Sequence, residues 1–249
     1  MPTDAAEQKA AASRGDGRRV DELRPVELCP SWTKGPAGSV LTKQGDTWVL
    51  CTISLENRVP RWLLGRRSGW LTASYGLLPG STSERSPRER NGARGRTREI
   101  ERLIGRSLRV AIDLTAVGER TIHVDCDVLQ ADGGTRTASV TGGWLALALA
   151  CRELVGKGVF ESDPMVRQIA AVSVGVVDDE VLLDLDYSED LRAGTDLNVV
   201  MTADGRFVEI QGTAEREPFS GVELTRMLEL AESGTRQLAD LQSEVLRDR

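Results

Sequence analysis

The alternation of apolar and polar residues predicts a strand most clearly at residues 121–129. Four apolar side chains share one face and three polar side chains share the other: Ile122, Val124, Cys126 and Val128 against His123, Asp125 and Asp127. Further strands are expected at 40–55, where a turn at 44–46 divides two strands, and at 69–78, 169–177, 181–187, 197–202 and 206–211. Because Asp204-Gly205 is a strong tight-turn sequence, the last two strands should form a hairpin.

Apolar residues recur at helical spacing in three segments. Helices are expected from Thr97 to Ile112, from Thr135 to about Val155, and from Gly221 to Arg247, where Ser233-Gly234 could interrupt the last one. Residues 79–96 have no apolar periodicity and predict a long loop of the kind that is functional or disordered. Strands therefore lead into helices twice, at 38–112 and at 121–248. This predicts an α+β fold with two duplicated strand-and-helix halves, although no residue-level repeat is visible.

The length and composition of the chain fit one compact domain, since 40% of its 249 residues are hydrophobic. We predict a disordered tail at 1–13, which is Ala-rich, charged and without the apolar centre of a signal peptide, followed by one domain at 14–249. No stretch approaches the ~20 continuous apolar residues of a membrane span. These features predict a cytoplasmic protein without a membrane partner.

The scarcity of histidine and the spacing of cysteine exclude several kinds of chemistry. Cys29, Cys51, Cys126 and Cys151 lack the short spacing of a zinc site or redox motif and are expected to be buried free thiols. His123 is the one histidine, and its strand pattern predicts a solvent-facing or packed side chain. Schemes that need Ser–His–Asp or Cys–His pairs are therefore weakened, and no complete P-loop is present. The chemistry is expected to depend on carboxylates and arginines.

The net charge of −6 is distributed unevenly along the chain. From Arg58 to Arg109 there are 13 Arg, no Lys and 4 acidic residues, a local balance of +9 that leaves −15 for the remainder. Such segregation concentrates a positive field on one face and is typical of nucleic-acid binding. The alternative is a solvated loop in an Arg-biased protein, because the whole chain has 28 Arg and 4 Lys.

The strongest candidate site lies at residues 125–139. A strand runs into Gly133-Gly134 and then directly into a helix whose first turn contains Thr135, Arg136 and Thr137. Helix N-termini offer unpaired N–H donors and a partial positive charge, glycines allow close backbone approach, and arginine matches the geometry of phosphate. The stretch predicts an anion site, with an ordinary helix capped by Thr135 as the alternative.

A second candidate site is an acidic segment at 184–196. Asp190 and Asp196 flank a short loop that could bring two carboxylates to one side. Paired carboxylates bind Mg²⁺ or keep one proton for general acid chemistry, whereas acidic surface decoration is the alternative. Arg94-Gly95-Arg96-Thr97, at the start of the first helix, is a weaker third piece that is supported only by nearby guanidinium groups.

Taken together, these motifs resemble the ribonuclease PH family over about residues 14–240. The matching segments are RGDGR (14–18), DELRPV (21–26), GSVL (38–41), GDT (45–47), VPR (59–61), YGLLP (75–79), GRT (95–97), Ile100, RLI (102–104), LQADGGTRTAS (129–139), AVSVG (171–175), Asp196, NVVMT (198–202) and EIQGTAE (209–215). The resemblance implies a single α+β domain of the ribonuclease PH type, similar to the second domain of ribosomal protein S5. It also implies a homohexameric ring built as a trimer of dimers.

The family's activity implies phosphorolysis of the 3′ extension of tRNA precursors, with release of nucleoside 5′-diphosphates and a reversible reaction. Turnover of other RNA and of rRNA 3′ ends stays open. The matched motifs imply phosphate binding at Arg96, Gly134, Thr135 and Arg136, and general-acid and Mg²⁺ roles at Asp190 and Asp196.

Contacts with RNA are implied for Arg61, Arg85 and Arg88. Gly80 stands where some members of the family have another Arg, and the loop at 79–94 looks slightly shorter than in those relatives, so RNA affinity or ring packing could differ. One alternative is a non-catalytic, RNA-binding ring subunit of an exosome-like assembly, which predicts loss of the phosphate-site Arg or of the aspartates. Another is a generic phosphate-binding metabolic enzyme, which leaves the basic segment unexplained.

Overall fold

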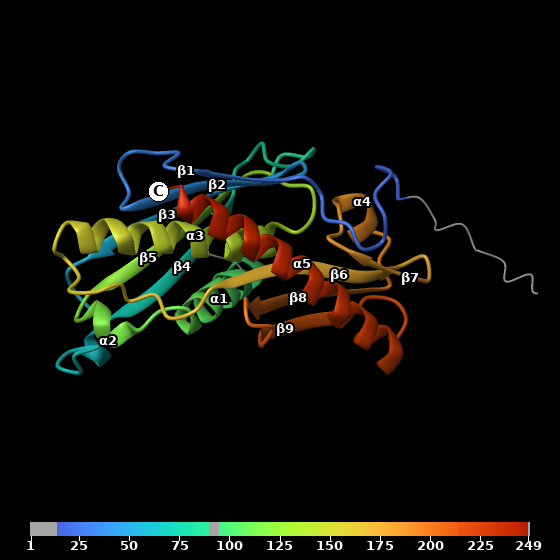
Figure 1. Ribbon diagram of the computed structural model, residues 1–249. Helices are drawn as coiled ribbons and strands as arrows, with labels where there is room; N and C mark the ends of the chain where they lie inside the picture. Colours follow the sequence, from blue (N-terminus) through green and yellow to red (C-terminus); the bar gives the residue numbers. More distant parts are fainter. Residues whose placement is uncertain (1–13, 90–94, 249) are drawn as a thin grey trace, which may run out of the picture.

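The computed structural model describes residues 14–89 and 95–248, which form two β-sheets with helices packed on them (Figure 1). The first sheet has five strands in the order β1-β2-β3-β5-β4. Their bounds are Val26–Pro30 (β1), Gly38–Gln44 (β2), Thr47–Glu56 (β3), Trp70–Leu77 (β4) and Thr121–Gln130 (β5). Neighbouring strands are antiparallel except β4 and β5, which run parallel.

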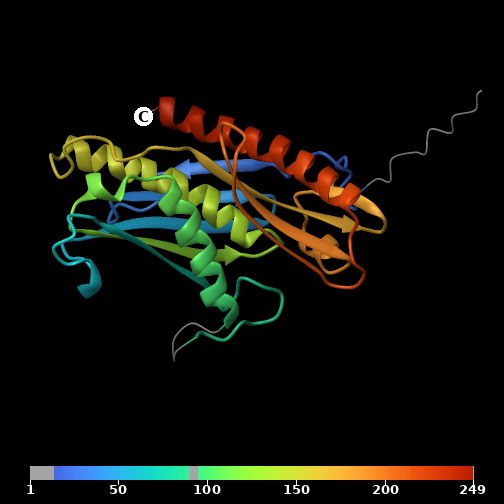
Figure 2. The same ribbon diagram turned by 90° about the horizontal axis from the view of Figure 1, so that it is seen from below.

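The second sheet has four antiparallel strands in the order β7-β6-β8-β9. Their bounds are Ile169–Val177 (β6), Glu180–Leu183 (β7), Thr195–Thr202 (β8) and Phe207–Ala214 (β9). The long helix α5 (Gly221–Arg247) lies along β6, β7 and β8, as Figure 2 shows from below. Its apolar face buries Met227, Leu230 and Leu238 against this sheet, as its helical periodicity predicts.

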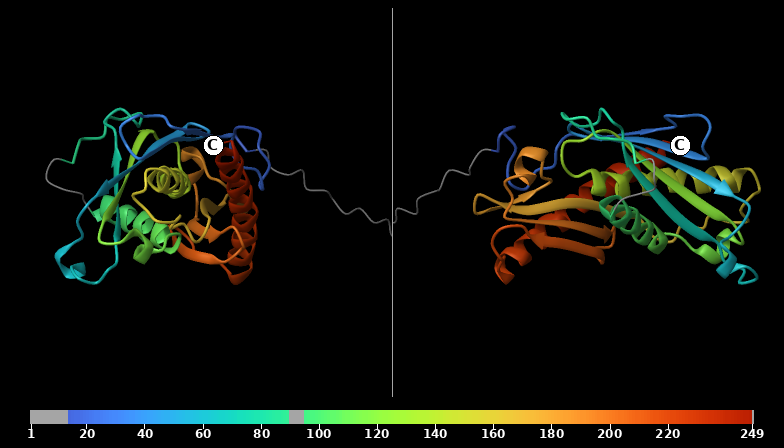
Figure 3. Two further views of the ribbon diagram at one scale, coloured as in Figure 1. Left: turned by 60° about the vertical axis from the view of Figure 1, so that its left-hand side comes forward. Right: turned by 180° about the vertical axis from the view of Figure 1, so that it is seen from behind.

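The helix α3 (Thr135–Gly156) lies in the middle of the molecule, between β2 and β3 on one side and β6 on the other. The left-hand view of Figure 3 looks nearly along the axis of α3 and shows the strands and helices that surround it. It is long and apolar enough to cross a membrane by length and composition, but 78% of that stretch is buried inside the protein. A helix that is apolar on all sides is expected at such a place in a core. The helix α1 (Gly95–Val110) packs on β4 and α3.

The α+β class predicted from the sequence is confirmed, and most predicted strands and helices are present within a few residues. The boundary between the halves differs. β5 joins the first sheet, so the first half continues through α3 and the second begins at β6. All four cysteines are free, and three of them are buried, while Cys29 is partly exposed. The domain limits 1–13 and 14–249 stay a prediction, because the tail lies outside the described residues.

Two expectations about individual elements were wrong, and two further short elements were missed. The strand expected at 181–187 ends at Leu183, because Asp184 has a φ of 55° and Asp186 caps a short helix, α4 (Tyr187–Asp190). The last helix is not interrupted at Ser233-Gly234. A Cβ on Gly234 would lie 2.8 Å from Leu183 Cδ1, so this glycine allows close packing of α5 on the sheet. The short elements β1 and α2 (Leu114–Val117) were not predicted, because they are too short to show periodicity.

The parallel pair β4 and β5 decides where the candidate site lies. Both strands have their C-terminal ends on the same side of the first sheet, and β5 leads from there into α3. The loop after β4 is bound to the same side, because the Leu78 N–H donates to the Val128 carbonyl at 3.0 Å and the Ala131 N–H donates to the Ser81 carbonyl at 2.8 Å. The described part of this loop, up to Glu89, contains no helix or strand, as predicted.

Candidate functional site

The turn between β5 and α3 is held by two buried side chains from the start of the chain. Thr47 Oγ1 donates to the Gly133 carbonyl at 2.6 Å and accepts from the Asp132 N–H at 3.0 Å. The Arg24 guanidinium donates to the Asp132 carbonyl. Gly133 and Gly134 have φ angles of 73° and 64°, in the left-handed region that favours glycine. The two glycines are therefore required by the shape of this turn.

The first turn of α3 differs in one detail from the expected cap. Gly134 is the N-cap and no side chain caps the helix, so Thr135 is the first helical residue and the alternative in which Thr135 caps an ordinary helix is not observed. Thr137 Oγ1 donates to the Gly134 carbonyl at 2.9 Å and is buried. The remaining N–H groups of the first turn point out of the helix toward its N-terminal end, which is the arrangement that binds anions.

Arg136 has a buried Nε atom without a hydrogen-bond partner among the described residues. A buried donor of this kind costs free energy unless a ligand or water accepts from it. Its charge acts on both Asp190 and Asp196, and that of Arg96, the second residue of α1, acts on Asp190. The structure therefore brings Arg96, Arg136 and the two predicted carboxylates to one place, although they come from four separate elements.

The two carboxylates have shifted acidities. Burial raises the pKa of Asp190, and the charges of Arg136 and Arg96 offset only part of this rise. Removal from water also raises the pKa of Asp196, and the negative charge of Asp190 raises it further. Asp190 is the last residue of α4, and Asp196 follows the first residue of β8. The negative charges around the two carboxylates, Asp190 on Asp196 and Glu215 on both, are of the kind that a bound proton or a cation offsets.

Glu215 is a member of this acidic group that the sequence did not single out. Its charge raises the pKa of both Asp190 and Asp196. Its backbone N–H donates to the Gly194 carbonyl at 2.8 Å, which fixes it beside the loop between the two aspartates. It lay within the matched segment 209–215, but nothing in the spacing of that segment distinguished it from a surface residue.

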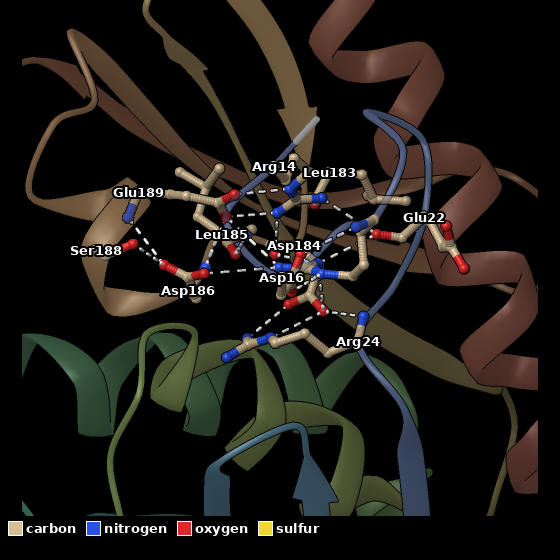
Figure 4. A network of polar contacts seen from close by, with 12 residues as sticks. Arg14, Asp16, Glu22, Arg24, Leu183, Asp184, Leu185, Asp186, Ser188 and Glu189 are labelled. Atoms are coloured by element: carbon tan, nitrogen blue, oxygen red, sulfur yellow. Dashed lines mark hydrogen bonds and ion pairs between the residues drawn. The ribbon is translucent and has the colours of Figure 1, made fainter. Parts of the chain in front are cut away.

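The helix α4, which contains Asp190, is fastened by an ion pair from the start of the chain (Figure 4). Arg14 Nε and Nη2 donate to the two carboxylate oxygens of Glu189 at 2.7 and 2.5 Å, and both side chains are 2% exposed. Arg14 also donates to the carbonyls of Leu183 and Asp184 at 2.7 and 2.8 Å. Glu189 completes the capping box of α4 with Asp186. Arg14 therefore holds Glu189, the residue before Asp190, to the end of β7.

We call the ion pair between Arg14 and Glu189 the clamp. Next to it, a second buried pair, Arg24 and Asp184, joins the two halves (Figure 4). Arg24 Nη2 and Nε donate to the Asp184 carboxylate at 2.7 and 3.1 Å. Burial by itself raises the pKa of Asp184, but the charge and hydrogen bonds of Arg24 outweigh it and hold the pKa below its usual value. The same Arg24 holds the Asp132 carbonyl, so one side chain connects the glycine turn to the segment that leads into α4.

The glycine turn and α4 also contact each other directly. The Tyr187 N–H donates to Asp132 Oδ1 at 3.3 Å. A Cβ on Gly133 would lie 2.6 Å from the Leu185 carbonyl oxygen and 2.9 Å from the Tyr187 nitrogen, so only glycine allows this approach. The phosphate side and the carboxylate side of the candidate site are thus built as one unit.

The predicted RNA-contacting arginines fall in two different places. Arg85 and Arg88 are exposed in the loop after β4, near the site, and the charge of Arg88 acts on Asp127 at the end of β5. Arg61 lies in a 3₁₀ turn before β4. Arg61 precedes the start of β4, whereas the site lies beyond its end, and the eight residues of β4 extend over about 26 Å at about 3.3 Å per residue. Within one chain, Arg61 is therefore not part of the site. Arg94 lies outside the described residues.

The described residues contain no group of three or more His, Cys, Asp or Glu side chains arranged to hold a metal ion. Any divalent cation here would depend on the pair Asp190 and Asp196, with oxygens of water or substrate as its other ligands. His123 is distant from this chemistry. It is on the outer face of the first sheet, 38% exposed, with Nε2 3.3 Å from a Glu56 carboxylate oxygen.

Comparison with known proteins decides the family. The family models named "3′ exoribonuclease family, domain 1" and "domain 2" match residues 22–153 and 167–234. The chain belongs to the ribonuclease PH family of 3′ exoribonucleases. It is 55% identical over 239 residues to a ribonuclease PH of Synechococcus sp. (strain CC9605), covering 94% of this chain and 95% of that protein. A ribonuclease PH of Corynebacterium kroppenstedtii is 54% identical over 235 residues, with 94% and 92% covered.

The ribonuclease PH fold extends to solved structures of low sequence identity. An Archaeoglobus fulgidus exosome with RNA bound to the active site superimposes with a TM-score of 0.80 over 92% of both chains at 22% identity. The resemblance stated from sequence motifs is thus confirmed, together with the fold class.

Proposed function

We propose that this chain shortens RNA from the 3′ end by phosphorolysis. An oxygen of inorganic phosphate attacks the phosphorus of the last phosphodiester bond, and the bond from that phosphorus to the 3′-oxygen of the preceding nucleotide breaks. The products are a nucleoside 5′-diphosphate and an RNA that is one nucleotide shorter. The exchange of one phosphodiester for one phosphoanhydride is nearly balanced, so polymerisation should occur when diphosphates are abundant.

The observation that supports this activity best is the pairing of an anion-binding helix end with two carboxylates of raised pKa. The glycine turn, the first turn of α3, Arg96 and the unpartnered Nε of Arg136 would hold phosphate. Preorganised donors of this kind also stabilise the charge that develops on phosphoryl oxygens in the transition state. Family membership supplies the reaction class.

Asp190 and Asp196 would act on the leaving group. Since both pKa values are raised, a proton can be kept near neutral pH more readily than on an ordinary carboxyl, and it can be donated to the departing 3′-oxygen. A Mg²⁺ ion also fits this pair, because each carboxylate is destabilised by a like charge that a cation would offset. When bound there, Mg²⁺ would neutralise charge on the non-bridging phosphate oxygens.

We infer further that the substrates are tRNA precursors with 3′ extensions, that the chain acts in the cytoplasm, and that it forms a homohexameric ring. A solved structure named "Archaeal exosome core" resembles this chain with a TM-score of 0.75, and this likeness supports a ring-forming fold. RNA would be captured by Arg85 and Arg88, with Arg61 acting at a distance from the site or from a neighbouring subunit. A non-catalytic ring subunit is disfavoured, because Arg96, Arg136, Asp190 and Asp196 are all present.

The test is incubation of a 3′-extended tRNA transcript with and without inorganic phosphate. Shortening that requires phosphate and releases nucleoside 5′-diphosphates supports the proposal. Equal shortening in phosphate-free buffer, with release of monophosphates, would replace it with hydrolysis. The mass of the native complex in solution tests the ring separately, since a stable monomer or dimer would exclude a hexamer without affecting the chemistry.

A further inference from the structure

Tyr75 lies at the edge of the phosphate site, and none of the roles described above involves it. Its ring belongs to the core of the first half, and the residue is 8% exposed. It comes from β4, close to the end of the strand. Its phenolic oxygen lies 2.8 Å from Thr135 Oγ1, a hydrogen bond that crosses 60 residues of sequence. The strand β4 is thereby connected to the first helical residue of α3.

The two arginines of the phosphate site also act electrostatically on Tyr75. The charges of Arg96 and Arg136 both act on its hydroxyl, which means that the phenol is close to the two arginines assigned to phosphate. Burial nevertheless raises the pKa of Tyr75, so the hydroxyl stays protonated at neutral pH and remains a donor. A buried phenol almost always finds an acceptor for its hydrogen.

The direction of this hydrogen bond decides what Thr135 can do. A threonine hydroxyl has one hydrogen to donate and two lone pairs that accept. If Tyr75 donates to Thr135 Oγ1, the single hydrogen of Thr135 is left to donate to another group. Thr135 begins α3, so the group in front of it is the anion that the helix end attracts.

We propose that Tyr75 is a positioning residue of the phosphate site, whose hydroxyl donates to Thr135 and turns the hydrogen of Thr135 toward bound phosphate. The proposal rests on the proposed function of that site. It deepens that function, because the two hydroxyls form a relay from the core to the co-substrate. A phenylalanine would fill the same core space, so the core alone does not require the phenolic oxygen.

The substitution Tyr75→Phe removes one oxygen and leaves the ring. We expect the KM for inorganic phosphate to rise roughly three- to tenfold, the range that corresponds to one net hydrogen bond. The kcat at saturating phosphate and the affinity for RNA in the absence of phosphate should change less than twofold. The matched control is Trp32→Phe. Trp32 is an aromatic residue that is 53% exposed between β1 and β2, at the end of the first sheet away from the site, so the phosphate KM of this variant should equal that of the wild type.

A double-mutant cycle separates positioning from packing. Thr135→Val keeps the shape of the side chain and removes both hydrogen bonds. In that background, adding Tyr75→Phe should change the phosphate KM by less than twofold, because the relay is already broken. Thr135→Ser retains the hydroxyl and should keep a phosphate KM close to the wild-type value. Additive effects of the two substitutions would overturn the proposal.

A binding measurement removes the dependence on turnover and on the folding of any variant. With tyrosine labelled by ¹³C at the ζ carbon, the protein gives two signals, one each from Tyr75 and Tyr187. Titration of the wild type with inorganic phosphate, without RNA, should shift the Tyr75 signal at the concentration that half-saturates turnover. A Tyr75 signal that does not respond would overturn the proposal even if Tyr75→Phe failed to fold.

The same data distinguish failure of this proposal from failure of the proposed function. If the wild type shortens RNA equally well without phosphate, the phosphate site itself is wrong and the relay has no substrate. If the wild type requires phosphate while Tyr75→Phe has the wild-type KM, only the role of Tyr75 is wrong.

Discussion

Replacement of Arg136 by methionine tests the phosphate site with the largest expected effect. Methionine keeps much of the side-chain length and removes the guanidinium, whose Nε is buried without a partner among the described residues. Loss of one preorganised donor to a developing oxyanion costs about 2–4 kcal/mol in transition-state stabilisation. That corresponds to a decrease of about 30- to 900-fold in kcat/KM for phosphate. RNA binding measured without phosphate should barely change.

The pH dependence of the Arg136→Met variant supplies a second, independent readout. Arg136 lowers the pKa of both Asp190 and Asp196, against the effect of their burial. Without its charge, both pKa values should rise further. Whether the reaction uses the protonated or the ionised carboxyl, the limb of the kcat profile that these groups control should move to higher pH.

The assay is a series of initial rates at varied phosphate and pH on one short RNA. The matched control is Arg236→Met, because Arg236 is a 66% exposed arginine of α5 that pairs with Glu232. The control should behave as the wild type in both readouts. A variant at Arg136 with wild-type dependence on phosphate would show that Arg136 is only a helix residue near the surface.

Three further predictions concern the carboxylates, the basic loop and the clamp. Asp190→Asn or Asp196→Asn should abolish turnover while circular dichroism and RNA affinity stay unchanged; near-normal rates in both at saturating Mg²⁺ would mean that the pair is decorative. Replacing Arg85 and Arg88 together should weaken binding of long RNA of any sequence and reduce the salt slope by roughly 0.7 log units per lost contact, with very short RNA unaffected. An unchanged slope would place the RNA path elsewhere. Arg14→Met should lower the free energy of unfolding by about 3–5 kcal/mol, because it removes the arginine that is hydrogen-bonded to both oxygens of the buried Glu189 carboxylate and leaves only Arg18 Nη2, at 3.6 Å, as an ion-pair partner among the described residues. Urea denaturation checks this, and a loss below about 1 kcal/mol would contradict it.

The sequence was sufficient for those parts of the site that depend on neighbouring residues. The glycine turn and the start of α3 follow each other within a few residues, so their spacing predicted both the turn and the start of the helix. The periodicity of β5 likewise predicted its buried and exposed faces. Turn chemistry and amphipathic periodicity are local properties, and the structure preserves them.

The remaining parts depend on contacts between distant segments. Arg14 and Glu189 are 175 residues apart, and nothing in either segment indicates that one holds the other. The hydrogen bond from Tyr75 to Thr135 depends on the parallel pairing of β4 with β5, which a list of strands does not specify. Arg61 shows the converse case. It is close in sequence to the basic loop, but it lies before the start of β4, whereas the loop follows the end of this strand. Residues 184–187 were predicted as the end of a strand, because a positive φ at Asp184 cannot be inferred from hydropathy.

The most direct test of the central claim follows the fate of phosphate itself. A 3′-extended RNA is digested with ³²P-labelled inorganic phosphate in water enriched in ¹⁸O, and the released mononucleotide is analysed. Phosphorolysis predicts a nucleoside 5′-diphosphate with ³²P in its β-phosphate and no ¹⁸O from solvent. A 5′-monophosphate that contains solvent ¹⁸O and no ³²P would mean that water is the nucleophile, and the assignment of Arg96, Thr135 and Arg136 to phosphate would be wrong.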